Sequence, residues 1–162
     1  MAVRTTYFRN FIFGVEDSLV STVGLLSGIA IAGVARETIF LTGVVLIFVE
    51  AFSMAAGSFL SEASAEEFEA RESVGPKRSI LAGSVMFASY FLAGFIPLFP
   101  YVAVPGDGAL VVSVSLSVIA LFALGAVSGA IARTRMLRSA LRMAVVGGVA
   151  IAVGVAVGLF LG

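Results

Sequence analysis

The chain has 162 residues, of which 60% are hydrophobic and only 12% are charged, and its mean hydropathy is +1.13. This composition excludes a soluble domain of this length and predicts an integral membrane protein. The ten basic and ten acidic residues cancel, so the net charge indicates no nucleic-acid partner. There is no histidine and no cysteine, which restricts metal ligands to carboxylate, thioether, hydroxyl or backbone oxygen.

Five apolar stretches are each long enough to cross a bilayer as a helix. They cover about residues 11–33, 38–60, 79–99, 109–131 and 141–161. Only Arg36 is basic on one side of these spans; the basic residues on the other side are Arg4, Arg9, Arg71, Lys77, Arg78, Arg133, Arg135, Arg138 and Arg142. The positive-inside rule therefore places the N-terminus in the cytoplasm and the C-terminus outside. The predicted fold is a single all-α, polytopic domain of five transmembrane helices.

The first span, FIFGVEDSLVSTVGLLSGIAIAG, carries Glu16 and Asp17 side by side. A carboxylate in hydrocarbon costs several kcal/mol, so a span that retains one usually uses it. The two side chains project about 100° apart around a helix, so at least one faces a protein interior or a wet path. We interpret this span as part of a cation site. Asp17 could instead bond to a hydroxyl of a neighbouring helix, and Glu16 could pair with a basic loop residue.

The second span continues into the polar, helix-forming stretch EASAEEFEARES, which has no Gly or Pro before Gly75-Pro76. The helix is therefore expected to extend into the cytoplasm to about residue 73. One face of this helix carries oxygen and sulfur ligands at helical spacing. They are Glu50, Met54, Ser58, Glu62, Glu66, Glu69 and Ser73. The cytoplasmic glutamates either form a solvated face or concentrate cations at an entrance.

Counting from the cytoplasmic ends of the first two spans places Asp17 and Met54 in one layer, both about 9 Å deep, with Glu50 about 6 Å deeper. Met54 alone would be an ordinary apolar filler. No basic residue shares the layer of Glu50, so this side chain is either protonated or occupied by an ion. Carboxylates with a thioether suit Fe²⁺ or Mn²⁺ better than Mg²⁺ or Ca²⁺. Such carboxyl groups can exchange a proton for a metal ion, which is the basis of antiport.

Two further patterns concern packing. Small residues recur at four-residue spacing, which lets helices approach closely within or between protomers. They are Gly24 with Gly28, Gly125 with Gly129, and Gly154 with Gly158 and Gly162. Pro97, Pro100 and Pro105 are expected to stop the third helix and to shape the loop around Asp107.

These stretches resemble the vacuolar iron transporter family of plants, fungi and prokaryotes. FGVEDSLVSTVGLLSGIA is similar to its first-helix signature, Phe-Gly-x-x-Asp-Gly-Leu-Val-Thr-x-x-Gly-Leu, with Asp17 in the Asp position. AFSMAAGSFLSEASAEE is similar to its second-helix signature, Ser-Met-Ala-Ala-Gly-Glu-Tyr-Leu-Ser, with Met54 in the Met position. FIPLFPY, residues 124–126 and LRSALRMAVVGGVA resemble the third, fourth and fifth helices.

The resemblance implies a five-helix protomer and a homodimer whose ion path, lined by Asp17 and Met54, lies between the subunits. It also implies proton-coupled movement of Fe²⁺, or Mn²⁺, out of the cytosol. The chain departs from the family pattern at three positions. Ser18 replaces a glycine, Ser58 replaces a glutamate, and Glu50 lies where the family is generally apolar. The short connection between the second and third spans lacks the large cytoplasmic metal-binding insertion of eukaryotic members.

We therefore predict a secondary transporter, not an enzyme, in a prokaryotic plasma membrane, with no cofactor besides the transported ion. No phosphate-binding glycine loop and no serine-hydrolase elbow is present. The predicted metal site comprises Asp17, Met54, Glu50, Glu16, Glu62, Glu66 and Glu69. Two alternatives stay open: a non-transporting anchor or accessory subunit of a metal-storage system, and a transporter of another cation or small solute.

Overall fold

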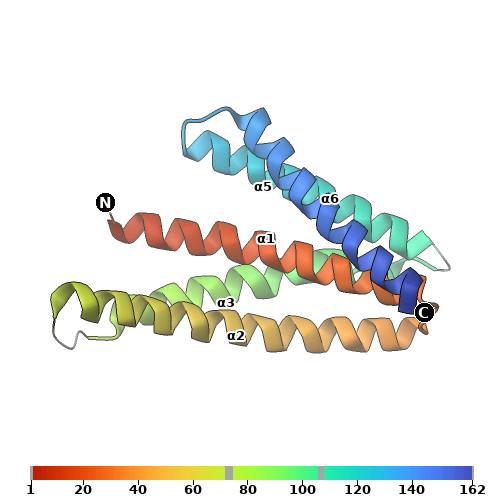
Figure 1. The fold of residues 1–162 in the computed structure, drawn as a ribbon, viewed down its shortest axis with the longest axis horizontal. Helices are drawn as coiled ribbons and strands as arrows, with labels where there is room; N and C mark the ends of the chain where they lie inside the picture. The colour runs from red at the N-terminus through yellow and green to blue at the C-terminus, as the bar shows by residue number, and fades with distance from the viewer. Residues whose placement is uncertain (1, 72–74, 106–107, 162) are drawn as a thin grey trace.

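The computed structural model describes residues 2–71, 75–105 and 108–161, and the regular structure in these ranges is entirely helical. The helices are α1 (Ala2–Ile31), α2 (Arg36–Ala70), α3 (Lys77–Leu98), α4 (Pro100–Ala103), α5 (Gly108–Ile131) and α6 (Met136–Leu161). Five segments, the third joining α3 to α4, are long and apolar enough to cross a membrane. The prediction of an all-α chain with five spans is confirmed. α1 starts and α6 finishes at opposite ends of the long axis (Figure 1).

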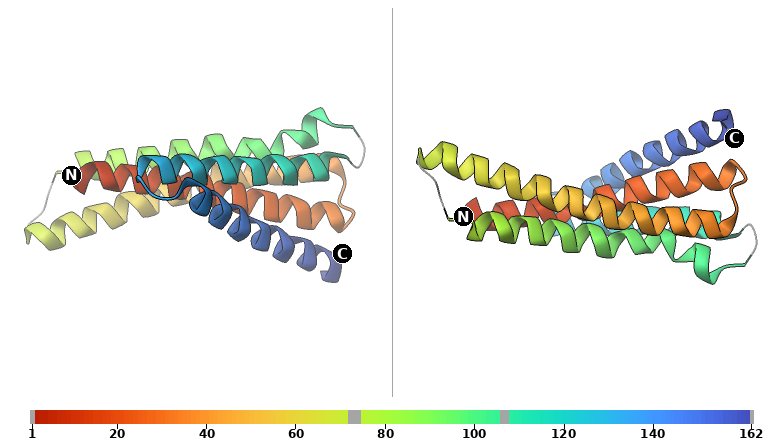
Figure 2. Two further views of the ribbon diagram at one scale, coloured as in Figure 1. Left: turned by 90° about the horizontal axis from the view of Figure 1, so that it is seen from above. Right: turned by 90° about the horizontal axis from the view of Figure 1, so that it is seen from below.

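α1 is the central helix of the fold. It contacts α2, α3, α5 and α6, and its Leu19, Val23 and Leu26 side chains are fully buried. α3 packs along both α1 and α2, whereas α5 and α6 form a hairpin that crosses α1 (Figures 1 and 2). Among the described residues, α2 makes no contact with α5 or α6. The fold therefore consists of a three-helix layer and a hairpin that meet at α1.

The outward faces of these helices are apolar. Phe52 on α2, Ile119 on α5 and Val153 on α6 are among the large hydrophobic side chains that stay more than half exposed. In water such a continuous apolar surface would be unstable, but lipid tails solvate it without cost. This surface is what the high hydropathy of the chain predicts for helices that span a bilayer.

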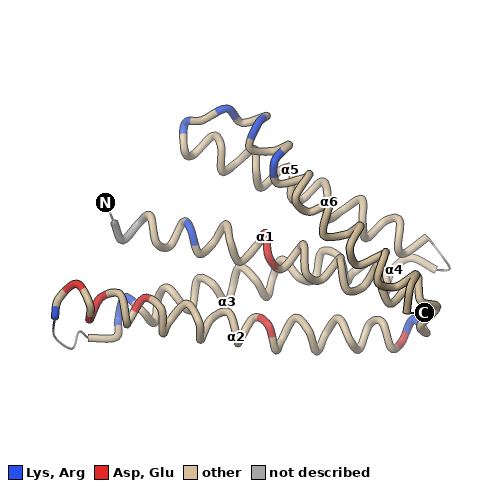
Figure 3. The backbone as a smooth tube through the Cα atoms, viewed as in Figure 1, with Lys and Arg blue, Asp and Glu red and all other residues tan. Residues whose placement is uncertain are grey.

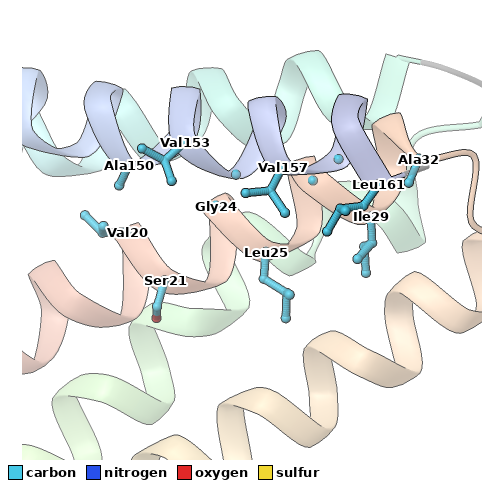
Figure 4. Close-up of a pocket in the computed structure, with 13 residues that line it drawn as sticks. Val20, Ser21, Gly24, Leu25, Ile29, Ala32, Ala150, Val153, Val157 and Leu161 are labelled. Atoms are coloured by element: carbon cyan, nitrogen blue, oxygen red, sulfur yellow. The ribbon is translucent and has the colours of Figure 1, made fainter.

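Glycines bring α1 and α6 into backbone contact. A Cβ added at Gly154 would lie 2.1 Å from the carbonyl oxygen of Gly24, and one added at Gly158 would lie 2.1 Å from that of Gly28. Only residues without a side chain fit at such a separation. Figure 4 shows the apolar groove beside this crossing, with Val157 on its α6 wall. The predicted role of these glycines in packing is confirmed, and it operates within one protomer.

The second glycine pair joins the two helices of the hairpin. A Cβ added at Gly125 would lie 2.6 Å from the carbonyl oxygen of Ser139, and one added at Gly129 would lie 2.9 Å from the Cα of Met136. These contacts confirm the predicted packing role for α5 against α6. Gly162, the last member of the predicted ladder, lies outside the described residues.

α3 ends at Leu98, within one residue of the expected end of the third span at 99, although Pro97 itself does not interrupt the helix. Pro97 lies inside α3, and the chain stays helical through Phe99 and α4 until Val104, which is extended. Pro100 is the first residue of α4, where a missing N–H needs no partner. The carbonyl of Pro97 accepts a hydrogen bond of 2.6 Å from Ser113 Oγ on α5. Both prolines thus occupy positions near a helix terminus, where a missing N–H costs little.

The basic residues gather at one end of the molecule, where the α2–α3 and α5–α6 connections lie (Figure 3). Arg36 lies at the other end and donates a hydrogen bond to the carbonyl of Tyr101, which ties the start of α2 to α4. Ser73 and Asp107 fall outside the described residues, as does the side chain of Arg4. The predicted orientation of the chain rests on this uneven distribution of charge.

Candidate metal-ion pathway

A polar side chain near the start of α1 fixes how α1, α2 and α3 are offset. Asn10 is buried, and its Nδ2 donates hydrogen bonds to Ser58 Oγ at 2.7 Å and to the carbonyl of Ala82 at 3.3 Å. Farther along, Leu26 packs over Gly43 of α2. Counting between these two contacts on the antiparallel helices places Asp17 opposite residue 51.

Asp17 therefore lies about level with Glu50, both side chains are half-buried, and the charge of Glu50 acts on the Asp17 carboxyl group. The acidic segments of α1 and α2 coincide along the long axis (Figure 3). We call Asp17 and Glu50 the carboxyl pair. In the described part of the chain, neither member has a basic residue within ion-pair distance.

This count differs from the prediction that Asp17 and Met54 share one layer. Met54 lies about one helical turn, roughly 5 Å, closer to the α2–α3 connection. The difference arises because the ends of hydropathic stretches do not fix how far one helix is shifted along another. The hydrogen bond from Asn10 to Ser58 sets that offset.

A tyrosine that the sequence interpretation missed joins the carboxyl pair from α3. Tyr90 is fully buried, and its hydroxyl lies 2.8 Å from Ser21 Oγ. Ser18 Oγ donates a hydrogen bond of 2.6 Å to the Tyr90 carbonyl, which sets α3 against α1. The phenol also interacts electrostatically with the charges of Asp17 and Glu50. One signal was available: Tyr90 is the only tyrosine in the apolar stretch 79–99.

Met54 lines a separate cavity of about 710 Å³ between α1, α2 and α3, which we call the vestibule. Its lining residues include Asn10, Met54, Ser58, Glu62 and Met86. Three residues of the predicted ligand face of α2 therefore share this cavity, whereas Glu50 lies deeper, in the carboxyl pair. The buried thioether of Met86 adds a second sulfur that the sequence interpretation did not single out.

The predicted collecting face of glutamates is only partly assembled. Arg78 Nε of α3 lies 3.1 Å from Glu62 Oε1 and 3.3 Å from Glu66 Oε1. Ser79 Oγ donates a hydrogen bond of 3.1 Å to Glu66 Oε2. Glu62 is buried by these contacts, whereas Glu69 is exposed. Arg78 thus brings Glu62 and Glu66 together, and Glu69 does not join them.

Glu16 points to a different part of the molecule from Asp17. It lines a shallow pocket with Arg9 of α1 and Ser128 of α5. The separation follows from the 100° between consecutive helical side chains. Within the described residues, no three acidic side chains converge on one point. Of the two adjacent acids of α1, Asp17 therefore faces Glu50 of α2, whereas Glu16 faces α5.

The fold and this site define a polytopic membrane protein with two half-buried carboxyl groups within its spans, an arrangement typical of membrane proteins that handle ions. The sequence matches the model of the VIT family over residues 8–78 and 67–159. The chain belongs to the VIT family, which confirms the resemblance seen in its first two helices.

Three relatives show how far the similarity extends. The chain is 38% identical over 80 residues to Vacuolar iron transporter 1 of Arabidopsis thaliana, a match that covers 49% of the chain and 32% of that protein. It is 34% identical over 76 residues to Vacuolar iron transporter 2 of Oryza sativa subsp. japonica, covering 46% and 31%. Vacuolar iron transporter homolog 3 of Arabidopsis thaliana is 29% identical over 167 residues, covering 93% and 80%. The chain thus spans about a third of the length of the first two relatives.

Proposed function

We propose that this protein moves a divalent transition metal, Fe²⁺ or Mn²⁺, across a membrane. Membership of the VIT family and the names of the relatives support iron as cargo. The observation that carries the proposal is the carboxyl pair: Asp17 and Glu50 are half-buried side chains on two spans that contact each other, and neither has a basic partner in the described chain. Two unpartnered carboxylates in a low-dielectric interior are costly, and a divalent cation neutralises both.

The route of the ion follows from the order of groups along α2. The arginine-rich end faces the cytoplasm by the positive-inside rule. There the exposed Glu69 attracts cations, whereas Arg78 pairs with Glu62 and Glu66. The vestibule offers the thioether of Met54 and the hydroxyl of Ser58. The carboxyl pair lies one turn deeper. The mixture of sulfur and oxygen ligands favours Fe²⁺ and Mn²⁺ over Ca²⁺. We propose that the ion enters from the cytosol at this end and leaves on the opposite side of the membrane.

Protons are the natural counter-substrate of such a site. The carboxyl pair can hold a divalent cation or protons, but it cannot hold both at once, so release of metal on one side and uptake of protons from that side are linked. This exclusion is the physical basis for the antiport part of the proposal. The pair also leaves coordination positions that water, backbone oxygen or a second copy would fill. The homodimer implied by the family resemblance is therefore part of the proposal.

Flux into proteoliposomes tests this function. The purified chain is reconstituted with a metal-quenched dye or a pH dye inside the vesicles, and metal is added outside. We expect Fe²⁺ and Mn²⁺ to enter, to compete with each other and to drive counter-movement of protons, whereas Ca²⁺ should not compete. Asp17→Asn and Glu50→Gln should each lower the rate by at least about tenfold. Glu37→Gln removes an exposed acid at the far end of α2 and should leave the rate unchanged.

Two outcomes would redirect the interpretation. A folded protein that passes no metal at any proton gradient would support the accessory-subunit alternative. Uptake that Ca²⁺ blocks as well as Mn²⁺ does would indicate a transporter of another cation.

A further inference from the structure

Residues 132–142, which comprise the α5–α6 connection and the start of α6, carry four arginines and no acidic residue. Arg135, Arg138 and Arg142 are spaced three and four residues apart, so they share one face at the start of α6. They line a hollow of about 690 Å³ together with Thr134 and Ser139. Figure 3 shows this basic group at the tip of the hairpin, away from the acidic end of α2.

These arginines have no counter-ion within the described part of the chain, where every ion pair involves Arg78. Like charges gathered around a hollow repel one another, and a bound anion relieves that repulsion. The positive-inside rule explains why basic residues lie at this end, but it requires neither a shared hollow nor arginine in preference to lysine. Arginine presents the planar fork that binds phosphate through two hydrogen bonds.

The surface next to the hollow indicates what carries the phosphate. Val145 and Val149 continue the stripe of Arg138 and Arg142 along α6 at the same helical spacing. Both valines are exposed, by 63% and 60%. The stripe thus changes from cationic to apolar within one turn, at the point where the helix enters the membrane. A free phosphate would use only the cationic part, whereas a phospholipid uses both.

We infer that Arg135, Arg138 and Arg142, with the hydroxyls of Thr134 and Ser139, bind the phosphate headgroup of an anionic phospholipid, whose acyl chain lies along Val145 and Val149. The site lies in the half of the fold that α2 does not touch, so it is separate from the carboxyl pair and the vestibule. It anchors the hairpin to the charged leaflet at the end of the molecule where the basic residues gather.

Native mass spectrometry of the full chain in detergent tests the inference. Phosphatidylglycerol and phosphatidylcholine are added together, and the lipid retained by the folded protein is counted. Wild type should retain phosphatidylglycerol selectively. Each arginine removed should weaken retention about fivefold, so R135Q/R138Q should lose most of it. R135K/R138K keeps the charge and the membrane topology, and it should fall between the two because an ammonium lacks the fork.

The matched control is R71Q/K77Q, which removes the same charge from exposed positions at the same end of the molecule, outside the hollow. This variant should retain the lipid as wild type does.

Equal losses of lipid in R71Q/K77Q and R135Q/R138Q would mean diffuse electrostatic attraction and would overturn the proposed site. Displacement of the lipid by millimolar inorganic phosphate would assign the hollow to a free anion. Loss of a dimer in R135Q/R138Q with lipid retention intact would assign it to a second copy of the chain. The readout needs no metal flux, so it is independent of the transport proposal.

Discussion

Replacing Gly154 by alanine tests the packing of α6 on α1. The added Cβ would lie 2.1 Å from the carbonyl oxygen of Gly24, whereas carbon and oxygen in contact need about 3.3 Å, so the helices must separate by about 1 Å. Overpacking of this kind costs about 1–3 kcal/mol. Gly148→Ala is the matched control on the same helix, because a Cβ there meets nothing within 4 Å. Both variants gain the same helix propensity, so their difference isolates the contact.

The measurement is the fraction of folded protein that survives a heat ramp in mild detergent, followed by size-exclusion chromatography. Gly154→Ala should unfold at a lower temperature than Gly148→Ala, which should match wild type or exceed it. Equal midpoints for the two variants would refute the backbone contact between α6 and α1.

Two other substitutions test the polar contacts by the same heat ramp. Arg78→Ala leaves Glu62 buried without its counter-ion and should lower the free energy of unfolding by about 1–3 kcal/mol. Arg71→Ala, at an exposed position, should change it by only about 0.3 kcal/mol. Equal effects of the two variants would show that the ion pair with Glu62 contributes nothing to stability. Tyr90→Phe removes the hydrogen bond to Ser21 and should cost about 1 kcal/mol; an unchanged midpoint would mean that this bond is not made.

The sequence was sufficient for the features that depend on a single helix. Apolar length predicts each span, because backbone groups in lipid must bond within their own helix. The four-residue spacing of Gly24 and Gly28 predicts a packing face, since a helix brings such residues to one side. The 100° step between Glu16 and Asp17 likewise predicts that they face different surroundings.

Features that depend on two helices at once were not predictable in this way. The level of Asp17 relative to α2 is set by the hydrogen bond from Asn10 to Ser58, and no local pattern encodes a partner 48 residues away. Tyr90 joins the site for the same reason, since it reaches α1 from a separate span. Pro97 is a further example, because the residue type alone does not say whether it ends the helix. It lies one residue from the end of α3, and its carbonyl is bonded by Ser113 of α5.

The central claim is that Asp17 and Glu50 together receive the transported ion. A crystal of the full chain soaked in Mn²⁺, with data collected at the manganese absorption edge, tests it most directly. We predict an anomalous peak between the carboxylate oxygens of Asp17 and Glu50, absent from Glu50→Gln crystals soaked in the same way. Manganese bound at Glu62 and Glu66 alone, with the carboxyl pair empty at every concentration, would contradict the claim.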